Sequence, residues 1–328
     1  MMKNNVVIRG LGRYAPEKVL TNADLEKIVE TSDEWIVTRT GIKERHIVEE
    51  GQFTSDLGTE AAKMALADAG MDADEITHII VGTFTPDHLV PSCACIIEKK
   101  LGIKNKVAFD IAAACTGFIY SLEMGRAMLA LHPDAKILCI GAEMVTHRVN
   151  FTDRTTCVLF GDGAGAAVLT NDGEGPELLD VKLATDGNLG SLLTVSGGGS
   201  ASTYKPGETI RDDYFIQLQG REVFKHAVRS MATICEEILE ANGLTKKNVD
   251  VLLPHQANWR IIDAVGRKFD IAPEKVYSNI DRFGNTSAAS VPLALSEAVE
   301  TGFIKDGDLV MLTAFGGGFT WGSALLKF

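Results

Sequence analysis

The stretch FDIAAACTGFIYSLEMGRAML (residues 109–129) joins a short apolar run to a helical pattern through a turn of small residues. In the helical part, apolar residues recur on one side: Phe118, Leu122, Met128 and Leu129. Cys115 therefore lies at a strand-to-helix turn, where the unpaired N–H groups and the dipole of a helix stabilise a thiolate. Two interpretations stay open for Cys115: a nucleophile with a lowered pKa, or a small buried hydrophobic residue, which is the commoner fate of a cysteine.

Apolar runs and helical patterns alternate along the sequence. Four short runs bounded by turn residues predict strands: HIIVGTF (78–84), KVAFDI (106–111), KILCIGA (136–142) and AGAAVLT (164–170). The segment TSDLGTEAAKMALADAG (54–70) predicts a helix that Thr54 or Ser55 caps and Gly70 ends. Strands that alternate with helices predict an α/β fold with a buried, largely parallel sheet.

The second half of the sequence repeats the order of the first. Five similar segments recur, about 158–173 residues apart, and three of the pairs are KVAFDIAAAC (106–115) with KVYSNIDRFGN (275–285), DAKILCIGAE (134–143) with GDLVMLTAFG (307–316), and GAGAAVLT (163–170) with WGSALLKF (321–328). Chance similarity between α/β stretches does not explain a shared order, so we infer an internal duplication. The expected halves are residues 1–173 and 174–328, packed as one body.

His255 and Asn285 follow strands of the second half. In VDVLLPHQANWRII (249–262), His255 ends a strand just before a helix that starts near Ala257, a position where α/β proteins build sites. Asn285, in the string GNTS, is the expected counterpart of Cys115 in the duplication. Taken alone, the histidine is more often structural, and GNTS is an ordinary helix cap and turn.

A pseudo-two-fold axis between the halves would bring Cys115, His255 and Asn285 together. A thiolate can take an acyl group from a thioester. His Nε2 and Asn Nδ2–H can then donate hydrogen bonds to a thioester carbonyl and stabilise an enolate. This set of residue types therefore suits acyl transfer.

Three further stretches are rich in glycine. AFGGGFTWGSALL (314–326) follows a strand, and its N–H groups could complete an oxyanion hole with that of Cys115. FGDGAGAAVL (160–169) runs into a strand instead of from a strand into a helix, which excludes a dinucleotide-binding turn. SGGGSASTYKPGETIRDD (196–213) predicts a long loop that is either functional or flexible.

Composition narrows the class of protein. The 328 residues predict about two domains or one large α/β unit, and 45% hydrophobic with 23% charged residues is typical of a globular protein. A net charge of −12 argues against non-specific binding to nucleic acid or an anionic membrane. We expect no transmembrane helix and no signal peptide in residues 1–18. The six cysteines lack CxxC spacing, so we expect no disulfide framework, no metal site and a cytoplasmic location.

These residues resemble the thiolase-fold condensing enzymes and, more narrowly, the β-ketoacyl-acyl-carrier-protein synthase III family, which starts bacterial fatty acid synthesis. The match runs from TNADLEKIVETSDEWIVTRTGIKERH (21–46) through AAACTGF, FGDGAGAAVL, PHQANWRII and GNTSAASVPLAL to FGGGFTWGSALLKF, and so covers essentially the whole chain. Elongating synthases of this fold use Cys with two His, and Asn285 in the third place indicates the initiating class. The resemblance implies a duplicated α-β-α-β-α layered architecture with two pseudo-two-fold related halves.

The resemblance also implies a reaction. Cys115 would take the acyl group from an acyl-CoA, most simply acetyl-CoA. His255 and Asn285 would promote decarboxylation of malonyl-acyl carrier protein and stabilise its enolate. Phe315 would lie near His255, and Gly317 N–H would join Cys115 N–H in the oxyanion hole. No cofactor is implied, because the CoA thioester is a substrate.

Binding residues follow from the same resemblance. Trp35 and Arg154 would sandwich the adenine of CoA, with Arg39 on the nucleotide side and Asn258 on the pantetheine arm. The acidic carrier protein would dock on residues that share a basic or carrier-facing position: Gln256, Ala257, Asn258, Trp259, Arg260, Lys225, Arg267 and Lys268. A homodimer is implied by the family alone.

The sequence departs from the family pattern at two places, and three alternative functions stay open. Val90 stands before Pro91, where some family members place a bulky Phe across the dimer interface, so a larger primer pocket is expected. The loop at 196–213 also looks longer than in compact members. The alternatives are a synthase of the same fold that uses another primer in polyketide metabolism, a thiolase or hydroxymethylglutaryl-type synthase, and a non-catalytic carrier-binding protein. A thiolase needs a second cysteine near its C-terminus, whereas the last one here is Cys235.

Overall fold

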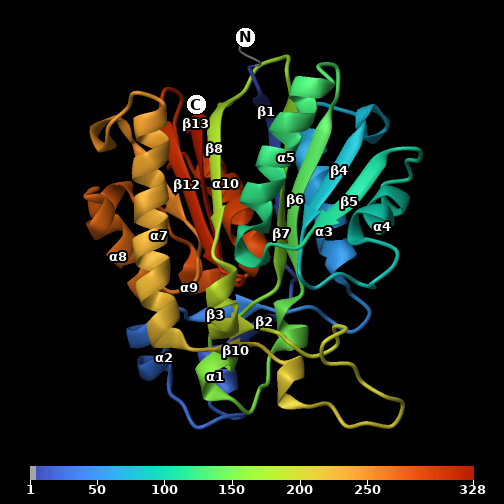
Figure 1. Cartoon of the computed structure of the whole chain (residues 1–328), viewed down its shortest axis with the longest axis vertical. Helices are drawn as coiled ribbons and strands as arrows, with labels where there is room; N and C mark the ends of the chain where they lie inside the picture. The colour runs from blue at the N-terminus through green and yellow to red at the C-terminus, as the bar shows by residue number, and fades with distance from the viewer. Residues whose placement is uncertain (1–4) are drawn as a thin grey trace.

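Nine strands form one sheet in the computed structural model, which describes residues 5–328 (Figure 1). Their order is β11-β12-β13-β8-β1-β7-β6-β4-β5. The strands are β1 (Val7–Tyr14), β4 (His78–Gly82), β5 (Val107–Ile111), β6 (Ile137–Glu143), β7 (Gly163–Thr170), β8 (Glu177–Thr185), β11 (Val251–Pro254), β12 (Leu309–Gly316) and β13 (Thr320–Lys327). The two halves meet where β1 pairs with β8 through Val7 and Glu177.

The strand order reads as the same unit twice. From the junction outward, β1, β7, β6 and β4 on one side correspond to β8, β13, β12 and β11 on the other. Beyond β11, Val276 bridges Leu252 in parallel, just as β5 lies parallel beside β4. The link between β7 and β8 contains the expected division between residues 173 and 174. The predicted pair of pseudo-two-fold related halves is confirmed.

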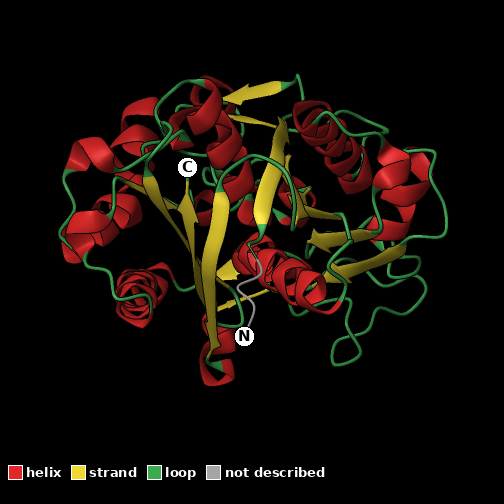
Figure 2. Cartoon of the chain, turned by 90° about the horizontal axis from the view of Figure 1, so that it is seen from above, coloured by secondary structure: helices red, strands yellow, loops and turns green. Residues whose placement is uncertain are grey.

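Helices form three layers with the strands between them. Helices α5 (Gly117–Leu131) and α10 (Ser290–Glu300) share one core with strands of both halves. Helices α3 (Thr54–Ala69) and α4 (Cys93–Lys100) cover the outer face of the first half, and α7 (Gly220–Ala241) and α8 (Trp259–Phe269) cover the second. Seen from above, helices flank the strands on both sides (Figure 2). This is the expected α-β-α-β-α layering.

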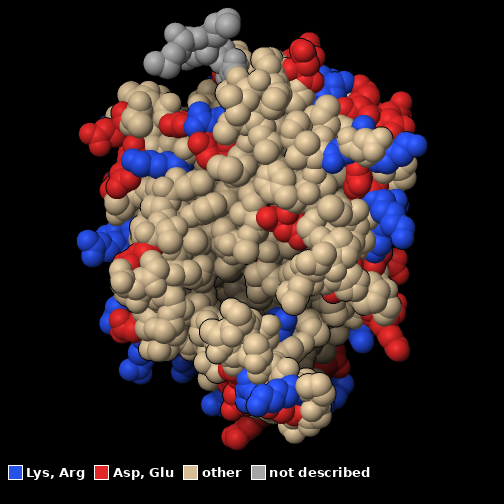
Figure 3. All heavy atoms as spheres, turned by 45° about the vertical axis from the view of Figure 1, so that its right-hand side comes forward, with Lys and Arg blue, Asp and Glu red and all other residues tan. Residues whose placement is uncertain are grey.

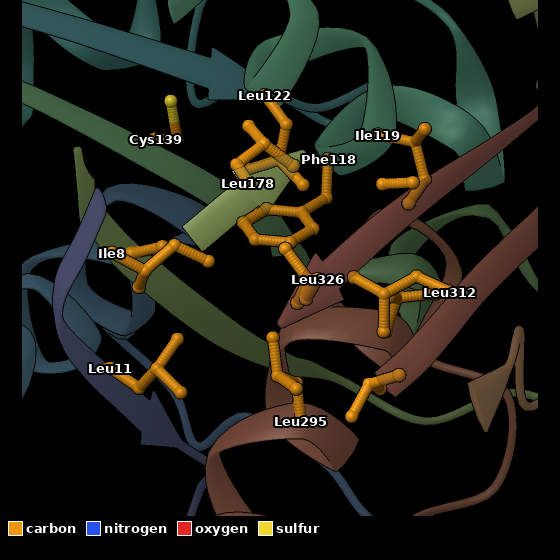
Figure 4. Close-up of a cluster of buried hydrophobic side chains, with 14 of the residues drawn as sticks. Ile8, Leu11, Phe118, Ile119, Leu122, Cys139, Leu178, Leu295, Leu312 and Leu326 are labelled. Carbon is orange, nitrogen blue, oxygen red and sulfur yellow. The ribbon is translucent and has the colours of Figure 1, made fainter. Parts of the chain in front are cut away.

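The central layer holds the halves together through apolar packing. Phe118 and Leu122 of α5 point toward Leu326 and Leu178 of the second half, and Leu295 approaches from α10 (Figure 4). Phe118, Leu122 and Leu295 are each 0% exposed. Full burial of such a side chain contributes about 1.5–3 kcal/mol.

The sheet is mixed, so the expectation of a largely parallel sheet is wrong. β4 lies parallel to β5 and β6, and β11 to β12, whereas the pairs β6–β7, β7–β1, β1–β8, β8–β13 and β12–β13 are antiparallel. Residues 317–319 alone connect β12 to β13. So short a link permits only an antiparallel return, because a parallel crossover needs about a dozen residues.

Two helix starts differ from the expected ones. Helix α3 ends at Gly70 as predicted, but its first turn is closed by Asp56, whose Oδ2 accepts the Phe53 N–H at 3.0 Å. The expected caps are engaged elsewhere, since the hydroxyls of Thr54 and Ser55 donate to the loop at residues 85–87. Helix α8 begins at Trp259, and its N-cap is Asn258.

Shorter elements complete the chain below the sheet (Figure 1). They are β2 (Val19–Thr21), β3 (Glu44–His46), β9 (Leu193–Thr194), β10 (Gln217–Leu218), α1 (Asn22–Leu25), α2 (Asp33–Thr40), α6 (Arg154–Cys157) and α9 (Ile280–Phe283). Between residues 5 and 328, no helix has the length and apolarity needed to cross a membrane. The expectation of no signal peptide rests partly on residues 1–4, which lie outside the described residues.

Glycines let the turns before α5 and α10 approach the strands. A Cβ on Gly82 would lie 2.4 Å from the carbonyl carbon of Gly117, and one on Gly141 would lie 2.3 Å from the oxygen of Ala288. Neither distance is possible for a side chain, so both positions require glycine. The turns at residues 114–116 and 287–289 are thereby held close to the same ends of β4 and β6.

Candidate active site

One cavity of about 1650 Å³ brings together the residues expected to react. Cys115, His255 and Asn285 all line it, as do Phe315 and Gly317. The first comes from one half of the chain and the others from the second half. The fold therefore places the predicted catalytic residues around one space.

Cys115 lies in a short 3₁₀ turn, Ala114–Thr116, immediately before α5. Ala114, directly before it, has a φ of 45°, a conformation that few residues with a side chain adopt. Burial raises the pKa of the Cys115 thiol to about 12, although a hydrogen bond with Ser287 acts in the opposite direction. The expected lowering of this pKa is wrong, because desolvation outweighs the hydrogen bonds that lower it.

His255 is held as a neutral ring. Its Nδ1 lies 2.5 Å from Oγ of Ser290, the first residue of α10, and burial lowers its pKa to about 3. The N–H of Gln256 donates to the same Ser290 oxygen at 3.4 Å, so we assign the serine proton to Nδ1 of His255. The remaining ring proton then resides on Nε2. His255 is thus arranged to donate a hydrogen bond and not to accept a proton.

Asn285 is oriented by its own turn. Its Oδ1 accepts the N–H of Ser287 at 2.9 Å, which assigns Nδ2 to the other end of the amide as a donor. The backbone N–H of Asn285 donates to Leu159 at 2.8 Å and fixes the residue against the first half of the chain. The Asn285 amide therefore offers a non-titrating donor.

The structural counterpart of Cys115 is not Asn285. The turn Ala114–Thr116 precedes α5 as the turn Ser287–Ala289 precedes α10, which pairs Cys115 with Ala288. Ser287 has a φ of 51°, matching that of Ala114. The expected pairing of Cys115 with Asn285 is therefore wrong. It failed because the links before the two turns differ in length.

The glycine turn after β12 lies against the cysteine. A Cβ on Gly316 would lie 2.6 Å from the backbone nitrogen of Cys115. Phe315 packs on Phe319 with ring centroids 4.7 Å apart. Gly317 is therefore close to the Cys115 backbone, as an oxyanion hole requires, and that role remains a prediction.

Three of the four residues expected to bind CoA line the cavity. Trp35, Arg39 and Asn258 line it, and Arg154 does not. The guanidinium carbons of Arg39 and Arg154 each lie 4.9 Å from the centroid of the Trp35 ring. At that distance Arg154 contacts the ring directly, so an adenine can enter between them only if Arg154 swings away. Asn258 Oδ1 accepts the Arg260 N–H at 2.8 Å, which leaves its Nδ2 as the free donor.

The basic residues expected to meet a carrier protein divide into two groups. Lys225, Arg260 and Arg267 line the cavity together with Ala257, whereas Trp259 and Lys268 lie on the surface outside it. Three of these side chains already have partners: Lys225 pairs with Glu222, Arg267 pairs with Asp263, and Arg260 donates to the oxygen of Thr38.

The expectation that Gln256 belongs to the docking surface is wrong. It is 1% exposed, and its side chain donates to the oxygen of Pro254 and accepts from Ser278 and Asn279. These bonds tie the end of β11 to the turn before α9. The side chain of Gln256 is therefore structural and unavailable to a partner.

Val90 lies outside the cavity of its own chain and is 86% exposed. Its neighbour Leu89 does line the cavity and is 91% exposed. The expected role of Val90 needs a second copy of the chain, so it stays a prediction. The loop at 196–213 contributes Gly197, Gly198 and Gly199 to the cavity wall.

Sequence reasoning missed three polar residues around the site. Ser287 lines the cavity, Ser290 holds His255, and Glu143 lies fully buried at the end of β6. Glu143 had a signal, since a carboxylate that closes an apolar strand run is unusual. The two serines had none, because GNTSAAS is also an ordinary capping sequence.

Comparisons with known proteins agree with this geometry. Two family models match, described as 3-oxoacyl-[acyl-carrier-protein (ACP)] synthase III over residues 109–187 and as its C-terminal part over residues 239–328. The beta-ketoacyl-[acyl-carrier-protein] synthase III of Oleidesulfovibrio alaskensis is 55% identical over 329 residues, which cover 99% of this chain and 100% of that protein. The crystal structure of 3-oxoacyl-[acyl-carrier-protein] synthase III from Aquifex aeolicus VF5 has a TM-score of 0.90 and 46% identity, covering 98% of this chain and 100% of that one.

The doubled five-layer fold and a cavity lined by Cys115, His255 and Asn285 define a thiolase-like condensing enzyme, an acyltransferase. Within that class, full-length similarity at 55% identity settles the assignment. The chain belongs to the 3-oxoacyl-[acyl-carrier-protein] synthase III family.

Proposed function

We propose that this enzyme condenses an acyl-CoA primer, most simply acetyl-CoA, with malonyl-acyl carrier protein to initiate fatty acid synthesis. The products are 3-oxoacyl-acyl carrier protein, CoA and CO₂. One observation carries the proposal: a thiol, a neutral imidazole and an oriented amide, Cys115, His255 and Asn285, line the same cavity. The chemistry follows a ping-pong order through an acyl-Cys115 intermediate.

In the first half-reaction, the Cys115 sulfur attacks the thioester carbonyl of the primer. The N–H groups of Cys115 and Gly317 stabilise the oxyanion as it forms. The carbon–sulfur bond to CoA then breaks, and CoA leaves as its thiol. The product is a thioester between the acyl group and Cys115.

In the second half-reaction, malonyl-acyl carrier protein loses CO₂ inside the cavity. As the carbon–carboxylate bond breaks, its electron pair enters the thioester to form an enolate. His255 Nε2–H and Asn285 Nδ2–H donate to the enolate oxygen. The enolate carbon then attacks the acyl carbonyl, and the Cys115 sulfur departs and takes up a proton from solvent, which regenerates the thiol. A neutral His255 suits this role, because a donor with a fixed proton stabilises the enolate without taking a proton from it.

The binding residues fit the two substrates in turn. Trp35, Arg39 and Arg154 present aromatic and cationic surface for a nucleotide, and Asn258 Nδ2 can donate to the pantetheine arm. The carrier protein is acidic and the enzyme carries a net charge of −12, so docking depends on a local basic group. Four residues form this basic group. Arg260, Lys225 and Arg267 line the cavity, and Lys268 lies on the surface outside the cavity.

A thiolase-type reaction is disfavoured by the cysteines. Among the described residues, Cys115 is the one cysteine that lines the cavity. Cys235, the last in the sequence, is buried beside Ser323 and does not reach it. A synthase that uses another primer in polyketide metabolism keeps the same catalytic residues, and a profile of acyl-CoA substrates separates the two.

We also propose a homodimer in the cytoplasm. Leu89 and Val90 are large apolar side chains left almost fully exposed in one chain, as a surface covered by a second copy would be. One face of the molecule carries charged side chains mainly at its edges, around a broad uncharged centre (Figure 3). Sedimentation equilibrium tests this: a single species at the mass of one chain would contradict it.

The direct test is reconstitution with purified carrier protein. The enzyme is mixed with acetyl-CoA and malonyl-acyl carrier protein, and the carrier is analysed by intact mass spectrometry. A 3-oxobutanoyl adduct that forms with wild type and not with Cys115→Ala supports the proposed function. A longer or branched 3-oxoacyl adduct that forms only with the corresponding acyl-CoA would change the assigned primer, and no adduct from any primer would refute the function.

A further inference from the structure

Glu143 is a buried carboxyl group that the proposed reaction leaves unused. It ends β6, is 0% exposed, and has no Lys, Arg or His within ion-pair distance among the described residues. Its Oε2 accepts the hydroxyls of Thr83 at 3.0 Å and Thr85 at 2.5 Å, and its oxygens also accept the N–H groups of Phe84 and Thr85. Burial raises the pKa of Glu143 to about 7, although these hydrogen bonds act in the opposite direction. A carboxyl with this pKa can exchange a proton near neutral pH.

Ser287 connects that carboxyl to the cavity. Its hydroxyl donates to Glu143 Oε1 at 3.1 Å and also hydrogen-bonds the thiol of Cys115. The position of Ser287 is fixed, because its N–H donates to Asn285 and its φ of 51° sets the turn before α10. Ser287 thus stands between the Cys115 thiol, whose pKa it lowers, and the Glu143 carboxyl, to which it donates.

Cys115 needs a proton acceptor that His255 does not provide. Its thiol has a pKa of about 12, so very little thiolate exists at neutral pH without help. The Nδ1 of His255 is occupied by Ser290, and burial lowers the pKa of the ring to about 3. A base of that strength is a poor acceptor for a thiol proton.

We propose that Glu143, acting through the hydroxyl of Ser287, accepts the proton of Cys115 in the acylation step. The thiol proton passes to Ser287 Oγ as the serine proton passes to Glu143 Oε1. The sulfur then forms its bond to the acyl carbon. When the bond to CoA breaks, Glu143 returns its proton to Ser287 Oγ and the serine passes a proton to the departing CoA sulfur, so that the enzyme gains only the acyl group.

Few titratable groups lie close enough to Glu143 to respond to its charge. Cys115 on the turn before α5 and Cys93 on α4 are the titratable groups that respond to its charge, and Asp87 and Asp110 lie beside Cys93. Cys93 is buried with its pKa raised well above the ordinary range, so it stays protonated throughout the neutral range. A change near pH 7 in the rate at which Cys115 reacts therefore reports the ionisation of Glu143.

The experiment measures alkylation of Cys115 by iodoacetamide between pH 5 and 10, with peptide mapping to assign the site. In wild type we expect the rate to rise as Glu143 ionises near pH 7. Glu143→Gln keeps the shape but cannot accept a proton, so this rise should vanish and the rate at pH 8 should fall on the order of 100-fold. Ser287→Ala should have the same effect by breaking the chain.

Thr83→Val is the matched control, because it removes one hydrogen bond from the same carboxylate and keeps the proton chain. Loss of that donor raises the pKa of Glu143 further, so the rise should persist and move to higher pH. Glu143→Asp, which keeps a carboxyl group, should show part of the pH-dependent rise in alkylation rate that Glu143→Gln loses. If Glu143→Gln and Ser287→Ala keep the wild-type pH profile, the proposal is overturned. Should Glu143→Gln fail to fold by circular dichroism, Ser287→Ala decides alone.

This inference rests on the proposed function only for its acylation step. Alkylation needs no acyl-CoA, so wild type that alkylates with the expected profile but takes no acyl group refutes the proposed function and keeps the proton route. In wild type that does acylate, Glu143→Gln should slow acylation on the order of 100-fold. Once formed, its acyl-enzyme should condense within a few-fold of the wild-type rate, since no proton has to leave Cys115 before the carbon–carbon bond forms.

Discussion

Oγ of Ser290 lies 2.5 Å from Nδ1 of His255, so the first residue of α10 holds the histidine at the end of β11. The contact assigns the free ring proton to Nε2. Burial lowers the pKa of His255 to about 3, so the ring is neutral at any higher pH. With its tautomer fixed by Ser290, the neutral ring can still donate a hydrogen bond from Nε2. The second half-reaction depends on this tautomer.

Ser290→Ala should therefore slow decarboxylation of malonyl-acyl carrier protein by roughly tenfold, because Nδ1 can then carry the proton instead of Nε2. Acylation by acetyl-CoA should change less than about threefold, since His255 has no part in that step. Radiolabelled CO₂ release and rapid-quench acylation measure the two steps separately. Equal loss in both would show that Ser290 only supports the fold.

Asn285→Asp should abolish most decarboxylation. The substitution keeps the size of the side chain and its contact with the Ser287 N–H, but it replaces a donor with a carboxylate that repels an enolate. Removal of one such donor lowers a rate by about 10² to 10³. His255→Ala should act in the same direction. If either variant blocked acylation completely and left CO₂ release intact, the roles of Cys115, His255 and Asn285 would have to be reassigned.

Arg260→Ala should raise the KM for malonyl-acyl carrier protein by about tenfold and leave the acylation half-reaction nearly unchanged. Arg260 lines the cavity next to Asn258, where the arm of the carrier would enter. A lost charge of this kind acts mostly on association, so the effect should shrink at high salt. Lys305→Ala, an exposed cation on the loop before β12, is the control. Equal effects of the two substitutions would exclude a specific docking role.

Stability should depend on pH through Glu143. Its pKa is raised from 4.5 to about 7 in the folded state, so the folded state binds this proton more tightly than the unfolded state does. The stabilisation is fully present below pH 4.5 and is lost as pH rises through about 7. Relative to Glu143→Gln, the free energy of unfolding of wild type should fall by on the order of 3 kcal/mol across this interval. Urea denaturation at pH 5, 6, 7 and 8 measures it, and a constant difference would contradict the buried ionisable state.

Local pattern was sufficient for much of the fold. Strands such as β4 and β7 and the helix ended by Gly70 have periodicity and turn residues that reveal them. The repeated order of segments predicted the two related halves. Cys115, His255 and Asn285 do line one cavity, although the pairing of Cys115 with Asn285 that suggested it was wrong.

What the sequence could not reveal depends on distant packing. The direction of the Cys115 pKa shift follows from burial, which no neighbour of Cys115 in the sequence discloses. Gln256 looks like a surface residue until Ser278 and Asn279 fold against it. Glu143 and Ser287 are 144 residues apart and meet only because β6 packs against the turn before α10. Such pairs are set by tertiary contacts and leave no local pattern.

The central claim is that Cys115 carries the acyl group. Intact-protein mass spectrometry after mixing with acetyl-CoA alone, followed by peptide mapping, tests it most directly. We expect one added acetyl group, located on Cys115, which disappears when malonyl-acyl carrier protein is supplied. An adduct on another residue, or none with any acyl-CoA, would contradict the acyl-Cys115 intermediate.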